Sequence, residues 1–187
     1  MAVPNSHAMD SRASGLRTLG LRALGFTLVE LMITLAVLAI LVGLATPSFR
    51  DFTRSNQVTA ANNDLVTALN LARSEALRRS TGVTVCPSTD GAACGTAADW
   101  KSGWIVFEDA AGTGVVASAD KVVQKWSSIN GNIRIATASA NIQYQSTGSV
   151  VNAAGLDVSY TSCTGSRRRH IQVSGAGTIS TQIQTCS

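Results

Sequence analysis

The chain has 187 residues, of which 45% are apolar and 14% are charged, and its formal net charge at pH 7 is +4. Half of that excess lies in the first 25 residues, where Arg12, Arg17 and Arg22 face a single acid, Asp10. The remaining residues carry 12 basic and 10 acidic side chains, so the pI near 9.2 gives little support for a nucleic-acid partner.

Residues 26–45 form an apolar segment with one charged residue, Glu30. As an α-helix it would be roughly 30 Å long, which is enough to cross a bilayer. The basic residues before it predict a cytoplasmic N-terminus and an exported C-terminal part. A carboxylate inside such a segment is energetically costly, which marks Glu30 as a candidate functional residue with a partner. The alternative is a simple membrane anchor in which Glu30 reaches the interface.

The helix is expected to continue past this segment to about Arg79, with a bend at Pro47. Apolar residues recur every three or four positions in its second half, which predicts that one face packs on a sheet. The members of this face are Phe52, Val58, Ala61, Leu65, Ala68, Leu69, Ala72, Ala76 and Leu77. Gly82 is the expected stop signal.

From Val83 onward the pattern changes to short β-strands separated by Gly, Ser and Asn. The expected strands cover residues 83–86, 103–107, 121–126, 132–136, 141–145, 156–160, 168–173 and 177–184. Asn130-Gly131, between two of these strands, predicts a tight hairpin. Short antiparallel strands packed on one long helix give an α+β fold.

Four cysteines, Cys86, Cys94, Cys163 and Cys186, all follow the apolar segment, where an oxidising compartment favours disulfides. Three pairings are possible, and we favour the two that join nearest neighbours in sequence, Cys86–Cys94 and Cys163–Cys186. A metal site is the alternative, but the sequence lacks the C-x-x-C and histidine spacings that would support it.

Common catalytic motifs are absent from the sequence: it has no G-x-S-x-G, H-E-x-x-H, Walker loop or dinucleotide fingerprint. The two histidines, His7 and His170, lie in the N-terminal segment and in a basic strand. Asp109 and Asp120 have glycine neighbours but not the spacing of a calcium loop, so a polar turn is expected there. We therefore expect no enzymatic activity, no bound metal and no cofactor.

Residues 25–41 read GFTLVELMITLAVLAIL and resemble the class III signal of type IV pilins and type II secretion pseudopilins. The resemblance implies that a prepilin peptidase cleaves between Gly25 and Phe26 and that the new N-terminus is methylated. It also implies that Glu30 pairs with the N-terminal amine of a neighbouring subunit.

The same resemblance divides the chain into a cleaved leader (1–25), a transmembrane and filament-core helix (26–53) and a periplasmic globular domain (54–187). The protein would be a single-pass protein of the bacterial inner membrane before it enters a pilus or pseudopilus.

Residues 99–109, DWKSGWIVFED, resemble one branch of this superfamily, the minor pilins and pseudopilins FimT, FimU and GspH. This implies a pilin-like fold and a low-abundance subunit near the filament tip, which primes assembly with other minor and major pilins or pseudopilins. We expect Trp100 and Trp104 to pack in the core or against a strand.

Some FimT proteins capture DNA, and the resemblance carries a G-R-x-R motif near the C-terminus. The corresponding residues here, 177–180, lack both arginines. A separate cluster, Arg167, Arg168 and Arg169, could contact two or three phosphates of double-stranded DNA without sequence preference. Strand alternation would place Arg168 opposite the other two, with at least one side solvated. The alternative is a solvated strand edge that resists edge-to-edge pairing.

Overall fold

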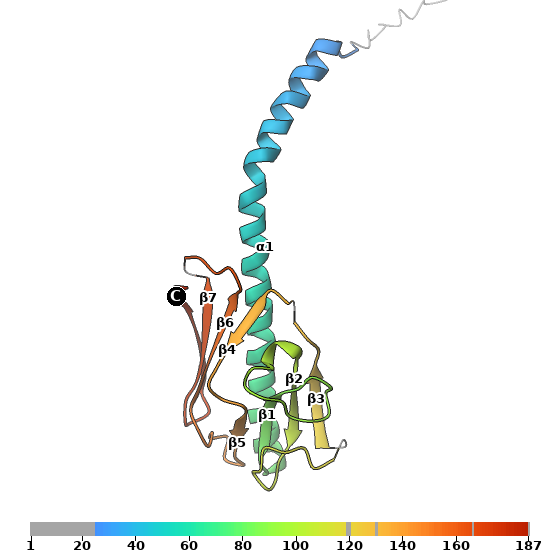
Figure 1. The fold of residues 1–187 in the computed structure, drawn as a ribbon. Helices are drawn as coiled ribbons and strands as arrows, with labels where there is room; N and C mark the ends of the chain where they lie inside the picture. The colour runs from blue at the N-terminus through green and yellow to red at the C-terminus, as the bar shows by residue number, and fades with distance from the viewer. Residues whose placement is uncertain (1–24, 119–120, 130, 166, 187) are drawn as a thin grey trace, which may run out of the picture. The chain divides into compact units, whose positions relative to one another are not determined.

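The computed structural model describes residues 25–118, 121–129, 131–165 and 167–186, except for the side chains of residues 44–48. The predicted leader up to residue 24 lies outside the described residues, as do Asp120 and Asn130. The chain divides after Leu44 into two compact units. Helix α1, Leu28–Arg79, contributes to both units and continues through Pro47 (Figure 1). Among the residues described, we find no helix whose length and hydropathy together suit a bilayer crossing.

The second half of α1 buries most of the apolar face that the sequence predicts. Seven of its nine members are buried, from Val58 to Ala76. Two assignments were wrong, because Phe52 and Leu77 are 63% and 50% exposed. Phe52 lies more than one turn before Val58, where the buried part of the helix begins. Leu77 directly follows Ala76 and therefore points about 100° away from it around the helix.

The end of α1 is set by Ser80 and not by the expected Gly82. Ser80 has a left-handed φ of 53°, and the N–H of Thr81 donates to the carbonyl of Ala76 at 3.3 Å. This six-to-one bond is that of a Schellman motif. Gly82 has a different role, because a Cβ there would lie 2.4 Å from the carbonyl oxygen of Asp109. Only glycine allows the two segments to approach this closely.

In the part of the chain that the structure describes, eight strands form two antiparallel four-stranded sheets, and each lies within about two residues of its predicted position. The first sheet has the order β3-β2-β1-β5 and the second the order β4-β6-β7-β8. The strands are β1 Val83–Pro87, β2 Trp104–Glu108, β3 Val122–Trp126, β4 Ile133–Ala136, β5 Ile142–Tyr144, β6 Ala154–Tyr160, β7 Arg168–Val173 and β8 Ile179–Gln184. A short 3-10 helix, η1 (Trp100–Ser102), precedes β2.

The predicted hairpin at Asn130-Gly131 is wrong, because the strands on its two sides belong to different sheets. β3 pairs with β2, whereas β4 pairs with β6, which is distant in sequence. Alternate residues of β4, Ile133 and Ile135, are buried in the core, and pairing with β6 keeps them there. The segment after β3 therefore crosses from one sheet to the other.

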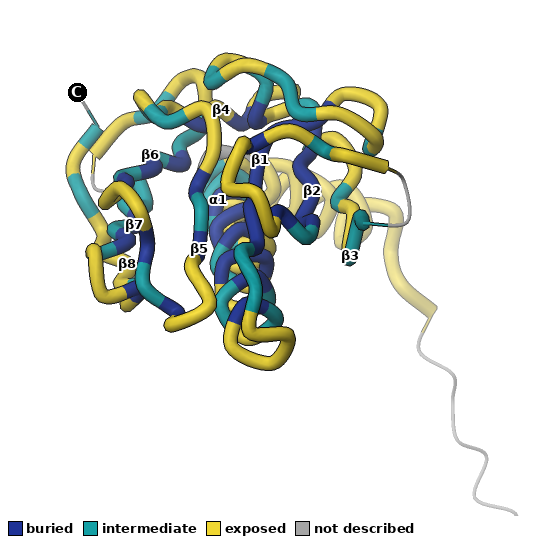
Figure 2. Tube along the Cα trace, turned by 90° about the horizontal axis from the view of Figure 1, so that it is seen from below, coloured by how far each residue is buried: buried dark blue, intermediate teal, exposed yellow. Residues whose placement is uncertain are grey.

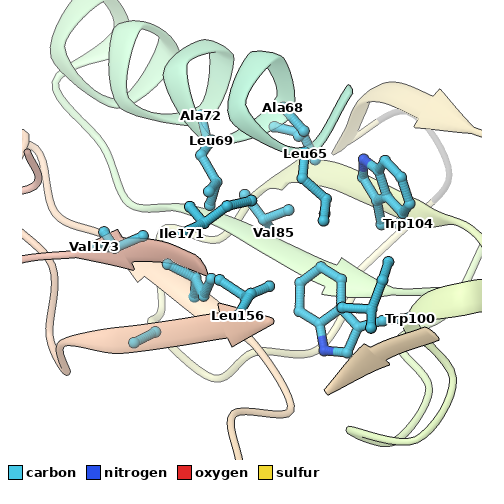
Figure 3. Packing of buried hydrophobic residues seen from close by; sticks show 14 of the residues in the cluster. Leu65, Ala68, Leu69, Ala72, Val85, Trp100, Trp104, Leu156, Ile171 and Val173 are labelled. Atoms are coloured by element: carbon cyan, nitrogen blue, oxygen red, sulfur yellow. The ribbon is translucent and has the colours of Figure 1, made fainter. Parts of the chain in front are cut away.

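The core of the second unit lies between α1 and the inner faces of both sheets. In Figure 2 the buried stretches of β1, β2, β6 and β7 lie around the second half of α1. Leu65 and Leu69 of α1 reach toward this core, where Val85, Leu156 and Ile171 meet (Figure 3). The four alanines of the helix face leave room for the strands to approach. Trp100 and Trp104 are fully buried in this cluster, which confirms the predicted packing role.

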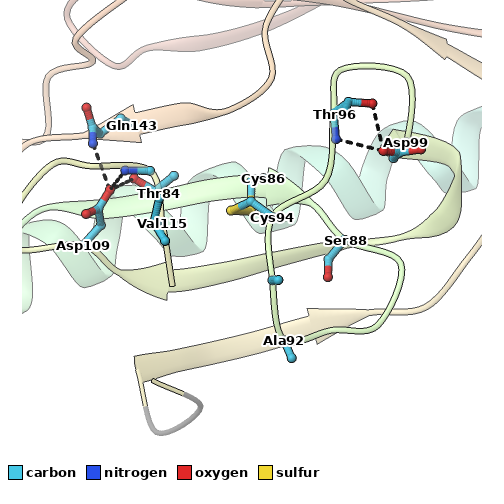
Figure 4. Close-up of a disulfide and its surroundings, with 12 residues drawn as sticks. Thr84, Cys86, Ser88, Ala92, Cys94, Thr96, Asp99, Asp109, Val115 and Gln143 are labelled. Atoms are coloured by element: carbon cyan, nitrogen blue, oxygen red, sulfur yellow. Dashed lines mark hydrogen bonds between the residues drawn. A yellow bond between two sulfur atoms is a disulfide. The ribbon is translucent and has the colours of Figure 1, made fainter. Parts of the chain in front are cut away.

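Both disulfides join the pairs that the sequence favours. Cys86–Cys94 closes the loop that follows β1 (Figure 4), and Cys163–Cys186 ties the β6–β7 connection to the end of β8. The N–H of Cys186 also donates to the carbonyl of Gly165 at 2.8 Å. The C-terminal strand is therefore held both covalently and by its pairing with β7.

Candidate functional site

The first turn of α1 is fixed by Thr27, which occupies the N-cap position. Residues 25–27 are not helical, and the N–H of Glu30 donates to Thr27 Oγ1 at 3.2 Å. The N–H of Leu31 donates to the carbonyl of Thr27 at 3.1 Å, which is the first bond of the helix ladder. The pattern T-x-x-E is that of a capping box, a signal present in the sequence that our sequence analysis missed. The bond between Gly25 and Phe26 therefore precedes the helix.

Glu30 is exposed in the first turn of α1, where the helix dipole favours a negative charge. It is the only charged residue in the described segment 25–43. Around it, large apolar side chains are more than half exposed on every face of the helix. They are Phe26, Leu28, Val29, Leu31, Met32, Ile33, Leu35, Val37, Leu38, Ile40, Leu41 and Val42. A helix that is apolar on all sides requires a covering surface, either lipid or other protein.

The arginine cluster lies at the start of β7, and the structure confirms its predicted alternation. Arg167 and Arg169 face α1, where Arg167 forms a two-point ion pair with Asp51 at 3.0 Å and Arg169 donates to Thr59 Oγ1 at 3.4 Å. Arg168 points to the other side and donates to Gln184 Oε1 at 2.7 Å. All three arginines are half-buried and have intramolecular contacts, so the cluster is partly solvated. The alternative of a strand edge is wrong, because β7 lies between β6 and β8.

His170 lies on the same side of β7 as Arg168, and its Nδ1 lies 2.7 Å from Asp157 Oδ1. Its Nε2 lies 3.2 Å from Gln172 Oε1. Both ring nitrogens of His170 thus have neighbours within its own sheet, which gives the ring a structural role.

Asp109 is a buried carboxylate that organises the loop after β2. Its Oδ2 accepts hydrogen bonds from Thr84 Oγ1, the N–H of Gly114 and Gln143 Nε2 at 2.8–2.9 Å (Figure 4). Its Oδ1 accepts from the N–H of Thr113 at 3.0 Å. Burial acts to raise the pKa of Asp109, but these hydrogen bonds outweigh it and hold the pKa below its ordinary value.

Both Asp109 oxygens thus accept hydrogen bonds from donors within the protein. Within the described ranges, we find no group of three or more His, Cys, Asp or Glu side chains that could hold a metal ion.

Two family profiles match the chain. The family described as Type II transport protein GspH matches residues 61–177, which is more than half of the chain. The chain belongs to the GspH family. The prokaryotic N-terminal methylation motif matches residues 21–46, which include the capped helix start and Glu30.

Solved structures agree with this assignment at the level of the fold. Two crystal forms of the type IV minor pilin FimU of Pseudomonas aeruginosa are similar to this GspH-family chain, with TM-scores of 0.56 and 0.53 at 18% identity. They cover 73% and 69% of this chain and 99% of FimU. The long helix packed on antiparallel sheets is therefore the pilin fold, as the sequence predicted.

Curated relatives match a short part of the chain. Two proteins named Fimbrial protein from Pseudomonas aeruginosa are 45% identical over 53 residues, which is 28% of this chain and 34% of theirs. A Fimbrial protein from Neisseria meningitidis is 38% identical over 72 residues, which is 35% of this chain and 42% of its own length. The chain thus spans about a third of the length of the first relatives.

The findings together place this GspH-family protein among the type IV minor pilins and pseudopilins of the FimT/FimU/GspH kind. The family and fold are those of structural subunits of filaments and not of enzymes.

Proposed function

We propose that this protein is stored in the inner membrane as a single-pass protein and then primes or caps the assembly of a type IV pilus or type II secretion pseudopilus. One observation supports this above the others: residues 26–43 expose apolar side chains on every face of a helix and carry a single carboxylate near its start. Lipid covers this surface before assembly, and the stems of neighbouring subunits cover it afterwards.

Charge pairing gives the assembly its specificity. Cleavage after Gly25 leaves an α-amine on Phe26, and methylation keeps that amine basic. In the filament core, an unpaired Glu30 carboxylate would lose its hydration at a cost of several kcal/mol. The amine of an adjacent subunit offsets this cost when it lies within about 4–6 Å. A stem whose Glu30 carboxylate finds no such amine therefore packs poorly in the filament core.

Variants of Glu30 test this pairing. Glu30→Gln keeps the size of the side chain and leaves the Thr27 cap intact, because the cap uses the backbone N–H of residue 30. We expect Glu30→Gln and Glu30→Ala to be cleaved normally but to enter filaments poorly, as judged by immunoblots of sheared filaments. Thr34→Ala, on the same exposed helix, is the control and should be incorporated normally. Normal incorporation of Glu30→Gln would contradict the pairing.

Processing is tested at Gly25. A Cβ at this position meets no atom of the protein within 4 Å, so a larger side chain does not disturb the chain itself. We expect Gly25→Glu to accumulate as an uncleaved precursor in the inner membrane, seen as a larger band. A mature band of normal size would show that the peptidase does not read this residue.

DNA binding for natural transformation is the alternative function, supported by the three consecutive arginines at the start of β7. These arginines do not replace the G-R-x-R motif. They lie at the start of β7, whereas Gly177, which corresponds to the glycine of the motif, follows the end of that strand. Asp51 also neutralises part of their charge. A gel shift with residues 46–187, which retain Asp51, and an Arg167/Arg168/Arg169→Ala variant tests the idea. If the wild-type protein leaves the migration of the DNA unchanged at low salt, DNA binding is ruled out.

A further inference from the structure

Basic and aromatic side chains gather where α1 enters the second unit. We name the residues Phe49, Arg50, Phe52, Arg54 and Arg167 the stem-base patch. Phe49 and Phe52 are 70% and 63% exposed and are one turn apart on the helix. Arg50 is exposed, and the side chains of Arg54 and Arg167 are 40% and 36% exposed. The core does not use this surface, and apart from Arg167 it comes from α1.

The patch keeps an excess of positive charge after its internal ion pairs are counted. Asp51 pairs with Arg167 at 3.0 Å and lies 3.8 Å from Arg54. Arg54 also lies over the ring of Tyr160, 5.1 Å from its centroid, which fixes the side chain without changing its charge. The patch has three arginines, and Asp51 offsets one of their charges, so two net positive charges remain.

The position of the patch along the chain sets its depth relative to a bilayer. The apolar segment ends at Ala45, and Phe49 and Arg50 follow about 6 and 8 Å further along the helix. Each headgroup region of a bilayer is about 5–8 Å thick. If residues 26–45 span the hydrocarbon, the side chains of Phe49 and Arg50 lie among the headgroups. Arg54, about 14 Å beyond Ala45, lies just outside them, where its charge still attracts anionic lipid.

We propose that the stem-base patch binds the headgroups of anionic phospholipids while the protein is stored in the membrane. This rests on the proposed membrane stage. The arginines supply donors for phosphate, and the exposed Phe49 ring lies at the level of the headgroups, where it can bury apolar surface against lipid. Double-stranded DNA would satisfy the arginines but would leave the Phe49 ring in water, so the lipid surface fits the patch better. Extraction into a filament must then break these contacts.

The test uses the full chain reconstituted into phosphatidylcholine vesicles with and without phosphatidylglycerol. Flotation first reports whether the protein is incorporated. Electron spin resonance with spin-labelled lipids then gives the selectivity for phosphatidylglycerol over phosphatidylcholine. The test variant is Arg50→Gln/Arg54→Gln, and Arg50→Lys/Arg54→Lys restores the charge. The control is Arg78→Gln/Lys125→Gln, which removes the same charge; Arg78 lies about 36 Å from Arg54 along α1. The leader arginines are present in every variant.

We expect the glutamine variant to lose selectivity by at least two-fold, with an upper limit near five-fold per arginine. The lysine variant and the distant control should keep the wild-type value, and 1 M salt should abolish the difference. Equal selectivity for wild type and glutamine variant would overturn the proposal while leaving the membrane stage intact. Failure to float with vesicles would overturn both. A gel shift that Arg50→Gln/Arg54→Gln abolishes, without any lipid selectivity, would assign the patch to DNA.

Discussion

Replacing Asp109 by asparagine should destabilise the second unit more than the same kind of isosteric change at any other carboxylate that the structure describes. Asp109 is 4% exposed, and its two oxygens accept hydrogen bonds from both sides. Oδ2 accepts hydrogen bonds from three donors, and Oδ1 accepts one from the N–H of Thr113. An asparagine offers one acceptor oxygen only, so its NH₂ group must face at least one donor.

The magnitude follows from these contacts. If the amide oxygen takes the Oδ2 position, the N–H of Thr113 loses its acceptor and meets another donor. An unsatisfied buried donor costs about 1–3 kcal/mol, and the three remaining bonds lose the strength that a charged acceptor gives them. We expect the free energy of unfolding to fall by about 3 kcal/mol. For an m-value near 2 kcal/mol per M, the urea midpoint drops by about 1.5 M.

The pH dependence provides an independent check of the cause. The hydrogen bonds lower the pKa of Asp109 in the folded state, so its stabilisation is complete above the unfolded pKa, about 3.9. It is lost as the pH falls toward the lower folded value. The difference between wild type and Asp109→Asn should therefore be constant from pH 5 to 8 and should shrink below about pH 4.

Urea unfolding of residues 46–187 with both disulfides intact measures this directly. Asp64→Asn is the matched control on an exposed part of α1 and should change stability by less than about 0.5 kcal/mol. An unchanged midpoint for Asp109→Asn would refute the role of the carboxylate. A deficit that does not shrink at all between pH 5 and pH 3 would refute its attribution to the ionised form.

Three further perturbations address the cap, the helix face and the disulfides. Thr27→Val removes the N-cap acceptor, worth about 1 kcal/mol, and should speed amide exchange of Glu30 about five-fold in detergent-solubilised protein; Thr34→Val should not. Ala68→Leu overfills the buried helix face and should cost about 1–3 kcal/mol in urea unfolding, whereas Ala60→Leu, on an exposed position, should be close to neutral. Cys163→Ser/Cys186→Ser opens the longer loop and should lower the free energy of unfolding by about 3.4 kcal/mol, against about 2.6 kcal/mol for removal of the Cys86–Cys94 bond. A reversed order of the urea midpoints would contradict the loop-closure argument.

Local signals in the sequence were sufficient for most of the fold. The spacing of apolar residues located α1 and its buried face from Val58 to Ala76, because that pattern depends only on the helical period. Runs of β-branched residues located the strands, and β7 was predicted with its observed bounds, residues 168–173. The nearest-neighbour disulfide pairing also held, since both cysteine pairs close short loops.

Features that depend on distant partners could not be predicted in this way. Asn130-Gly131 is a good hairpin dipeptide, but β4 finds a better partner in β6, which follows about 20 residues later. Gly82 resembled a helix stop because its contact with Asp109 is invisible in the sequence. In the candidate site, the ion pair between Asp51 and Arg167 joins residues 116 positions apart, so the partial neutralisation of the arginine cluster emerged only from the fold.

The identity of the first residue of the mature protein tests the central claim most directly. Mass spectrometry of the protein purified from its native membranes should find a chain that begins with N-methylated Phe26. An intact leader, or a terminus at any other residue, would contradict the account, because Glu30 would then have no neighbouring amine of the kind that assembly requires.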